Sequence, residues 1–170
     1  MTIIDAIWAR RSVRKYKDIP VEKDKLLTLI KAAAAAPSAS NRQPWEFVVV
    51  TERGLLDEIR GLNRYTNHNA PAAIAVCANI QKGYTFDLES FSVQDCSAAI
   101  ENILLAALEL DLGTCWLGIH PVQENCQGLR RILGIPEDIL PVGVVYVGYP
   151  DQFPEPRTQF ADELVHWEKY

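Results

Sequence analysis

The residues most able to do chemistry gather in two short stretches near the N-terminus. The first, "APSASNRQPWEF" (residues 36–47), places hydroxyl and amide side chains beside two prolines and a tryptophan, immediately before an apolar run. A plain helix-to-strand connection would favour glycine, and this stretch has none. Amide side chains both donate and accept hydrogen bonds, which suits a neutral, flat, polar ligand. We therefore interpret residues 36–47 as a ligand-binding loop.

The second stretch is basic. Five of the 17 lysines and arginines fall within eight positions, at Arg10, Arg11, Arg14, Lys15 and Lys17, in a chain whose net charge is −5. Such a local concentration of positive charge in an acidic protein suits a small anion such as a phosphate. A solvated basic turn explains the same pattern, and composition alone leaves both interpretations open.

Several other classes of site are disfavoured. The four cysteines form no CxxC pair, and the three histidines show no spacing typical of metal ligands. We expect reduced cysteines, no metal site and a cytoplasmic protein. The acidic net charge disfavours nucleic acid as a partner, and no apolar run approaches the 18 residues of a membrane span. The N-terminal "MTIIDAIWARRS" carries its charges after its apolar residues, unlike a secretory signal.

The elements that must position these stretches alternate between helix and strand. Hydrophobic periodicity predicts helices near residues 3–9, 20–36, 54–62, 92–112 and 126–133, and strands at 47–51, 72–78, 114–119 and 140–150. Residues 79–91 are expected to form a loop that shapes the pocket. Gly113 is expected as the left-handed residue that ends the long helix. No linker or repeat divides the chain, so residues 1–170 are expected to form one domain.

Two segments carry more apolar surface than one chain of this size can cover. The helix predicted at 92–112 has no polar face between Ile103 and Leu108. The C-terminal tail 151–170 carries Phe160, Leu164 and Trp167. Both features predict a homodimer, with the tail packed on the partner subunit.

Four motifs occur together in order: "RRSVR" after an N-terminal helix, "APSASNRQPWEF", "DLGTCWLG" and "PVGVVYVGYPDQFPEPR". Their order and spacing, from about residue 3 to residue 167, resemble those of the nitroreductase family of FMN-dependent NAD(P)H oxidoreductases, in its short version. The resemblance implies an α+β domain, a nitroreductase-like mixed β-sheet flanked by helices. It also implies an intertwined homodimer with two FMN molecules at the subunit interface.

The resemblance also implies the residues that contact FMN. They are Arg10, Arg11, Ser12, Arg14, Pro37, Ser38, Ala39, Asn41, Gln43, Asn63, Leu117, Gly118 and Arg157. Residues 10–14 would bind the flavin of their own chain, with Arg10 at the phosphate, Arg14 at the pyrimidine edge of the ring and Arg11 contributing its backbone. Residues 37–43 would reach the flavin of the other subunit.

The resemblance assigns roles in the FMN site to the remaining positions as well. Arg157 would close the phosphate site, although a surface position is the alternative, and Leu117 and Gly118 would bring the main chain close to flavin N5. Trp45 fits a core position better than a stacking position. Family members often carry a basic residue three positions after the asparagine that matches Asn63; here that position is Thr66.

The implied activity is transfer of a hydride from NADH or NADPH, through flavin N5, to a nitroaromatic, quinone or related acceptor by a ping-pong mechanism. The flavin supplies the redox chemistry, so no catalytic side chain is expected. The chain has no GxGxxG motif, which agrees with a nicotinamide that visits the flavin without a Rossmann domain. Two alternatives remain. The same site would serve another reduction (dehalogenation, enone reduction or flavin breakdown), or the protein binds flavin without turnover.

Overall fold

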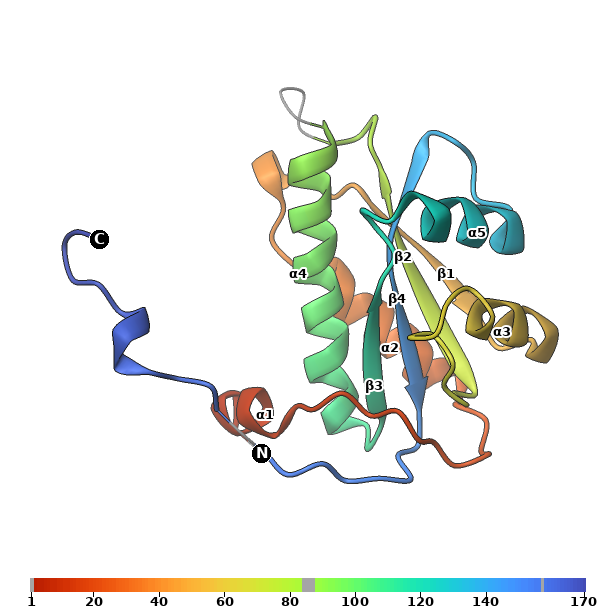
Figure 1. The fold of residues 1–170 in the computed structure, drawn as a ribbon, viewed down its shortest axis with the longest axis horizontal. Helices are drawn as coiled ribbons and strands as arrows, with labels where there is room; N and C mark the ends of the chain where they lie inside the picture. Colours follow the sequence, from red (N-terminus) through yellow and green to blue (C-terminus); the bar gives the residue numbers. More distant parts are fainter. Residues whose placement is uncertain (1, 84–87, 157) are drawn as a thin grey trace.

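The computed structural model describes residues 2–83, 88–156 and 158–170. Along the chain lie α1 (Ile3–Ala9), α2 (Lys23–Ala34), the 3-10 helix η1 (Ala39–Asn41), β1 (Trp45–Val50), α3 (Arg53–Arg60), β2 (Ala72–Asn79), α4 (Leu88–Glu109), β3 (Gly113–Gly118), α5 (Gln123–Leu133), β4 (Ile139–Gly148) and the 3-10 helix η2 (Asp162–Leu164) (Figure 1). The alternation of helices and strands predicted from the sequence is therefore confirmed, with boundaries shifted by a few residues.

The four strands form one sheet in the order β1-β2-β4-β3. Every neighbouring pair is antiparallel. Strands β2 and β3 run in the same direction across the connecting helix α4, but β4 lies between them and opposes both. The α+β class is confirmed. Within the described residues, the parallel pairing expected of a mixed sheet is limited to an isolated bridge between Ser12 and Thr114.

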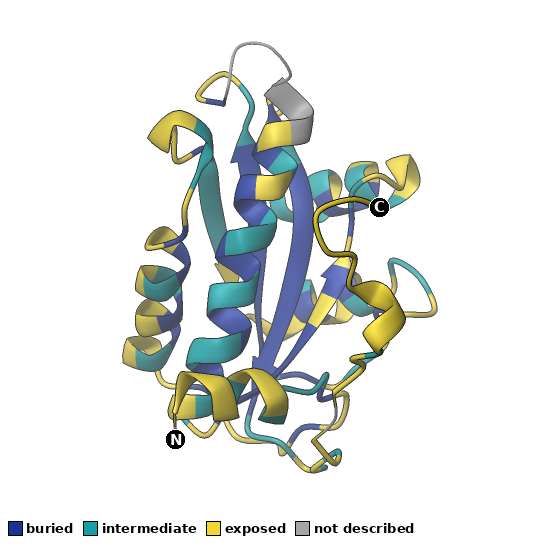
Figure 2. Cartoon of the chain, turned by 90° about the vertical axis from the view of Figure 1, so that its left-hand side faces the viewer, coloured by how far each residue is buried: buried dark blue, intermediate teal, exposed yellow. Residues whose placement is uncertain are grey.

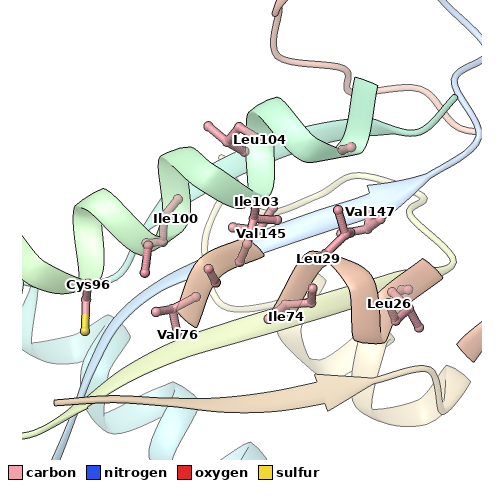
Figure 3. Close-up of a cluster of buried hydrophobic side chains, with 14 of the residues drawn as sticks. Leu26, Leu29, Ile74, Val76, Cys96, Ile100, Ile103, Leu104, Val145 and Val147 are labelled. Atoms are coloured by element: carbon pink, nitrogen blue, oxygen red, sulfur yellow. The ribbon is translucent and has the colours of Figure 1, made fainter. Parts of the chain in front are cut away.

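The sheet separates two hydrophobic clusters, one on each face. Helices α2 and α4 cover one face, where Leu29, Ile100 and Ile103 pack on Ile74 and Val145 (Figure 3). Helices α3 and α5 cover the other face (Figure 1). Alternate residues of the central strands β2 and β4 supply both clusters, as the two-residue period of a strand requires. This three-layer arrangement leaves β1 and β3 as the edge strands.

The long helix differs from its prediction at both ends. It begins at Leu88, inside the segment 79–91 that was expected to be a loop; residues 84–87 of that segment lie outside the described residues. It ends at Glu109, and the left-handed residue that follows is Asp111, with φ of 58°. The expectation for Gly113 was wrong. Gly113 begins β3, where a Cβ atom would lie only 2.8 Å from Cγ2 of Val13.

Two apolar segments lie outside the core. Helix α1, which begins with a capping box between Thr2 and Asp5, exposes Ile3 and Trp8. The C-terminal tail leaves the body of the chain and exposes Trp167, with 83% of its surface accessible (Figure 2). Surface of this kind marks an interaction site. None of the described helices is long and apolar enough to cross a membrane.

Candidate functional site

The basic N-terminal segment is fixed along the outer edge of β3. The Val13 N–H donates to the Thr114 carbonyl at 2.8 Å, next to the Ser12–Thr114 bridge. Val13 and Tyr16 are buried, and the Tyr16 hydroxyl donates to the Val13 carbonyl at 2.5 Å. Because extended residues alternate in direction, burying Val13 turns Ser12 and Arg14 away from the core.

The three arginines of this segment line a small polar pocket. Arg10, Arg11, Ser12 and Arg14 surround a volume of about 160 Å³, together with Ile7 and Gln159 from the tail. The Arg11 guanidinium donates to the Glu155 carbonyl, which ties the tail to this segment. Nε of Arg10 lies 3.5 Å from Oε1 of Glu101 on α4. The pocket concentrates permanent positive charge and hydrogen-bond donors, which is the chemistry that a phosphate requires.

A second recess adjoins this pocket and shares two of its residues. Arg10, Ser12, Glu101, Leu104, Trp116 and Gly118 line it, around about 390 Å³. Arg10 and Ser12 thus belong to both cavities, and Trp116 and Gly118 come from the edge strand β3. The structure therefore brings together the basic segment and the "TCWLG" strand, two motifs about a hundred residues apart in the sequence.

Gly118 lies at an open position of the β3 edge. The Thr114 carbonyl points outward to Val13, and the N–H of Ile119 donates to Val142 of β4 at 3.2 Å. Since alternate residues of an antiparallel strand face opposite edges, the backbone groups of Trp116 and Gly118 point outward with those of Thr114. A Cβ atom at Gly118 would lie 4.0 Å from the His120 carbonyl oxygen. The Leu117 side chain is instead buried among α3 and α5, so only its main chain reaches this edge.

The loop predicted to bind a ligand has an unusual backbone. Ser40, Asn41 and Gln43 have φ of 50°, 55° and 51°, in the left-handed region that residues other than glycine seldom occupy. The Ser38 hydroxyl accepts the Gln43 N–H at 3.0 Å, and the Ser38 carbonyl accepts the Asn41 N–H at 2.9 Å. Backbone strain of this kind concentrates at ligand-binding sites. Trp45, which follows the loop, packs against the core, as expected.

Two carboxylates of α4 hold the two predicted site segments. Asp95 accepts the Ala39 N–H at 2.9 Å, and Glu101 pairs with Arg10. Six residues of helix separate them, which is about 9 Å along the axis and roughly 120° around it. In Figure 1, η1 lies beside the upper end of α4 and α1 beside its lower end. Neither of the two cavities that Arg10 and Ser12 line includes a residue of the loop.

Asn63 lies in a turn on the opposite face of the sheet. Its amide donates to Oδ1 of Asn125 at 3.2 Å, and its Oδ1 accepts the Tyr65 N–H at 2.8 Å. Thr66, where the family resemblance implied a basic residue, is buried, and its hydroxyl donates to the Asn63 carbonyl at 2.7 Å. Asn63 is thus engaged in local contacts. Arg157 lies outside the described residues.

Burial and the charge of Arg14 shape the electrostatics behind the basic segment. The pKa of His68 is lowered by partial burial and then by the positive charge of Arg14. Burial raises the pKa of the Cys115 thiol, and Arg14 partly offsets that shift. Burial also raises the pKa of Cys77 and of Cys96 to about 12. Cys77, Cys96 and Cys115 are free and buried, and these thiols pack as small apolar groups.

A larger pocket lies elsewhere in the described part of the chain. It encloses about 700 Å³ beside the other edge strand, between α2 and α3, and Leu27, Val49 and Leu56 are among its lining residues. Within the described residues, no group of histidine, cysteine and acidic side chains could hold a metal ion.

The sequence interpretation missed six residues: Ile7, Glu101, Leu104, Trp116 and Gln159, which line the two cavities, and Asp95, which holds the loop. The sequence did contain a signal for Asp95 and Glu101. They are the only charged residues between Ser92 and Leu108, in a helix that is otherwise largely apolar.

The family model described as "Nitroreductase family" matches residues 7–66 and 56–149. A protein of Archaeoglobus fulgidus, with the provisional name NADH dehydrogenase/NAD(P)H nitroreductase, is 43% identical over 170 residues, covering 96% of each chain. A protein of Methanothermobacter thermautotrophicus with the same name is 39% identical and covers 100% of this chain and 88% of its own. The chain belongs to the nitroreductase family, and the predicted membership is confirmed.

Solved structures share the fold. A provisionally named NADH dehydrogenase/NAD(P)H nitroreductase of Parabacteroides distasonis matches with a TM-score of 0.92 at 37% identity, over 99% of this chain and 98% of its own. A provisionally named nitroreductase of Desulfovibrio desulfuricans, solved in complex with FMN, matches with a TM-score of 0.84 at 28% identity, over 100% and 98%. The NADPH:FMN oxidoreductase of Vibrio harveyi, solved with NAD+, matches with a TM-score of 0.86 at 26% identity, over 99% and 77%.

Proposed function

We propose that this protein is an FMN-dependent NAD(P)H oxidoreductase. The observation that carries the proposal is the junction of two cavities at Arg10 and Ser12, one polar and lined by three arginines, the other open to the free edge of β3. FMN has the matching parts: a phosphate dianion, a polar ribityl chain and a flat ring. Membership of the nitroreductase family and the activities named for its relatives support the same conclusion.

The residues of the joined cavities divide the binding of FMN among them. Arg10 and Arg11 lie where a phosphate would meet the largest number of donors, and the Ser12 hydroxyl is available to the ribityl chain. Arg14, exposed and permanently charged, suits the electron-rich pyrimidine edge of the ring. At Gly118 the main chain can approach the ring closely, because no Cβ atom stands in the way. Arg157 remains a predicted phosphate ligand.

When bound, FMN supplies the redox chemistry, taking a hydride from NADH or NADPH and passing reducing equivalents to a nitroaromatic, quinone or related acceptor in a ping-pong cycle. The chain would bind and orient the cofactor. In a ping-pong cycle, donor and acceptor would use the same place in turn. No catalytic side chain is assigned.

The active form is a homodimer in which each site uses two chains. The exposed apolar residues of α1 and of the tail need cover, and Ala98, Leu105 and Leu108 of α4 are only partly buried. The separation of the loop from the basic segment around α4 supports a loop that serves the partner's flavin. In this arrangement Pro37, Ser38, Ala39, Asn41 and Gln43 contact the partner's FMN, and the tail packs on the partner. A cytoplasmic location is part of the same proposal, and the buried thiols of Cys77, Cys96 and Cys115 support it.

Anaerobic mixing with NADH or NADPH tests the activity. The purified protein should carry one non-covalent FMN per chain, and the nicotinamide should bleach its absorbance at about 450 nm within seconds. Reoxidation by menadione or a nitroaromatic should restore the colour. Colour that persists with both nicotinamides would favour a flavin-binding protein without turnover. Rapid bleaching with reoxidation by a halogenated phenol or an enone alone would favour another reduction at the same site.

Mixed dimers test the composite site. An Arg10→Ala/Arg14→Ala chain should fail for its own flavin, and a Ser38→Ala/Asn41→Ala chain should fail for its partner's. In a mixed dimer, isolated with two affinity tags, one site collects both defects and the other none. It should bind about one FMN per dimer and recover roughly half of wild-type activity. A verified mixed dimer as weak as both parents would assign the loop to its own chain's flavin.

A further inference from the structure

The loop that precedes β1 depends on one contact from outside itself. Asp95 accepts the Ala39 N–H through Oδ1 at 2.9 Å, and the residue is only 5% exposed. Among the hydrogen bonds of the described residues, it is the one that joins residues 38–43 to another element. The start of η1 is thus anchored to the N-terminal half of the long helix.

An anchor is needed because the loop is strained. Three of its residues, none of them glycine, have positive φ, and each such conformation persists only where the surroundings enforce it. The hydrogen bonds made by Ser38 close the loop on itself but do not orient it relative to the sheet. An ionised carboxylate gives a stronger hydrogen bond than a neutral acceptor, so Asp95 suits this task.

The same carboxylate is poorly compensated. Asp95 Oδ2 is buried without a hydrogen-bond partner in the described part of the chain, as is Oγ of Ser92, one turn earlier on α4. Burying a charge with so few hydrogen bonds destabilises a fold, and a neutral residue of the same shape would be tolerated at least as well. The carboxylate at this position therefore has a role other than stability.

We propose that Asp95 is a positioning residue, which holds residues 38–43 in the conformation that binds FMN at the expense of fold stability. The inference rests on the proposed function, since it takes this loop to be part of a flavin site. Asp95 acts through the Ala39 N–H and does not itself contact the cofactor.

The test compares Asp95→Asn and Asp95→Ala with wild type, and uses Glu109→Gln as the control, because Glu109 is an exposed carboxylate on the same helix. In Asp95→Asn, the Tm should stay the same or rise, while the Kd for FMN increases about tenfold, since a neutral acceptor replaces a charged one. In Asp95→Ala, which leaves the Ala39 N–H without its acceptor, the increase should be larger. The control should change neither quantity.

Hydrogen exchange of the apo protein measures the anchor without FMN. Exchange in the peptide that contains residues 38–43 should quicken about tenfold in Asp95→Ala, and peptides from β2 and β4 should keep wild-type rates. A wild-type Kd for FMN in both Asp95 variants would overturn the proposal. So would a lower Tm in both variants with faster exchange throughout the protein, because that pattern describes an ordinary stabilising residue.

The failure of the proposed function has a different signature. If the wild-type chain does not bind FMN, the flavin role of the loop is lost whatever the Asp95 variants do. If wild type binds FMN, mixed dimers provide a second, independent test of the role of Asp95. Asp95→Ala should complement the Arg10→Ala/Arg14→Ala chain, because its defect also falls on the partner's flavin, and should not complement Ser38→Ala/Asn41→Ala. The reverse pattern would contradict a role through the loop.

Discussion

Replacing Gly118 by valine should separate cofactor binding from folding. A Cβ atom at this position would lie 4.0 Å from the His120 carbonyl oxygen, the nearest heavy atom outside the adjacent residues, so a side chain has room at its base. Glycine inside a strand is destabilising by roughly 0.5–1 kcal/mol relative to alanine, and valine favours strands further. The free energy of unfolding of Gly118→Val, and hence its Tm, should therefore stay the same or rise.

The effect on FMN should be large. Valine would occupy the space in which we expect the flavin ring and would keep it from the outward N–H of Gly118. Losing one hydrogen bond weakens binding by about 0.5–1.5 kcal/mol, and overpacking adds about 1–3 kcal/mol. The total of roughly 1.5–4.5 kcal/mol corresponds to a Kd for FMN that is about 10 to 2,000 times weaker. Gly118→Ala should show a smaller loss in the same direction.

The assay is a fluorescence titration with FMN, followed by stopped-flow measurement of flavin reduction and by thermal unfolding of each variant. Gly113→Ala, on the same strand, provides the contrast. Its Cβ would lie 2.8 Å from Cγ2 of Val13, so it should lose about 1–3 kcal/mol of stability, at about 2–4 °C of Tm per kcal/mol. An unchanged Kd and reduction rate in Gly118→Val would show that the main chain does not approach the ring there. A marked fall in its Tm would contradict the open space.

Three further outcomes follow from the same structure. FMN should bind several kcal/mol more tightly than riboflavin, and Arg10→Ala should weaken FMN by about 1.5–3 kcal/mol with little effect on riboflavin; equal binding of the two flavins would remove the phosphate role. Because burial raises the pKa of Cys77 and Cys96 to about 12, a thiol reagent at pH 8 should modify at most one of the four thiols of the folded protein and all four in guanidinium; two or more fast-reacting thiols in the folded state would contradict the buried positions. Burial, with a smaller effect of Arg14, lowers the pKa of His68 in the folded protein, so the unfolded chain binds that proton more tightly and stability should fall as the pH drops through about 6.5; His68→Gln should flatten this part of the profile, and an identical profile would refute the assignment.

The sequence by itself determined the order and type of the elements. The two-residue and 3.6-residue periods of hydrophobicity depend on neighbours along the chain, so they located β2, β4 and the long helix without knowledge of the fold. The four motifs identified the family. These are local properties, which a sequence carries explicitly.

Contacts between residues that are distant in the sequence were decided only by the tertiary structure. Strand β4 lies between β2 and β3, which makes the four strands antiparallel and leaves β3 with a free edge. Pairing of that edge with Ser12 brings Arg10 beside Trp116 and Gly118. The sequence placed Gly113 at a helix end, but close contact with Val13 explains that glycine.

The two carboxylates of α4 also show what the sequence reveals and what only the packing decides. The sequence displayed Asp95 and Glu101 as isolated charges in an apolar helix, but it could not tell which segments they meet. Packing assigned Glu101 to Arg10 and Asp95 to the strained loop, about 9 Å apart along the helix and on different sides of it. Which side chains meet across a fold depends on how the layers pack, because contacts between distant residues leave no periodic trace in the sequence.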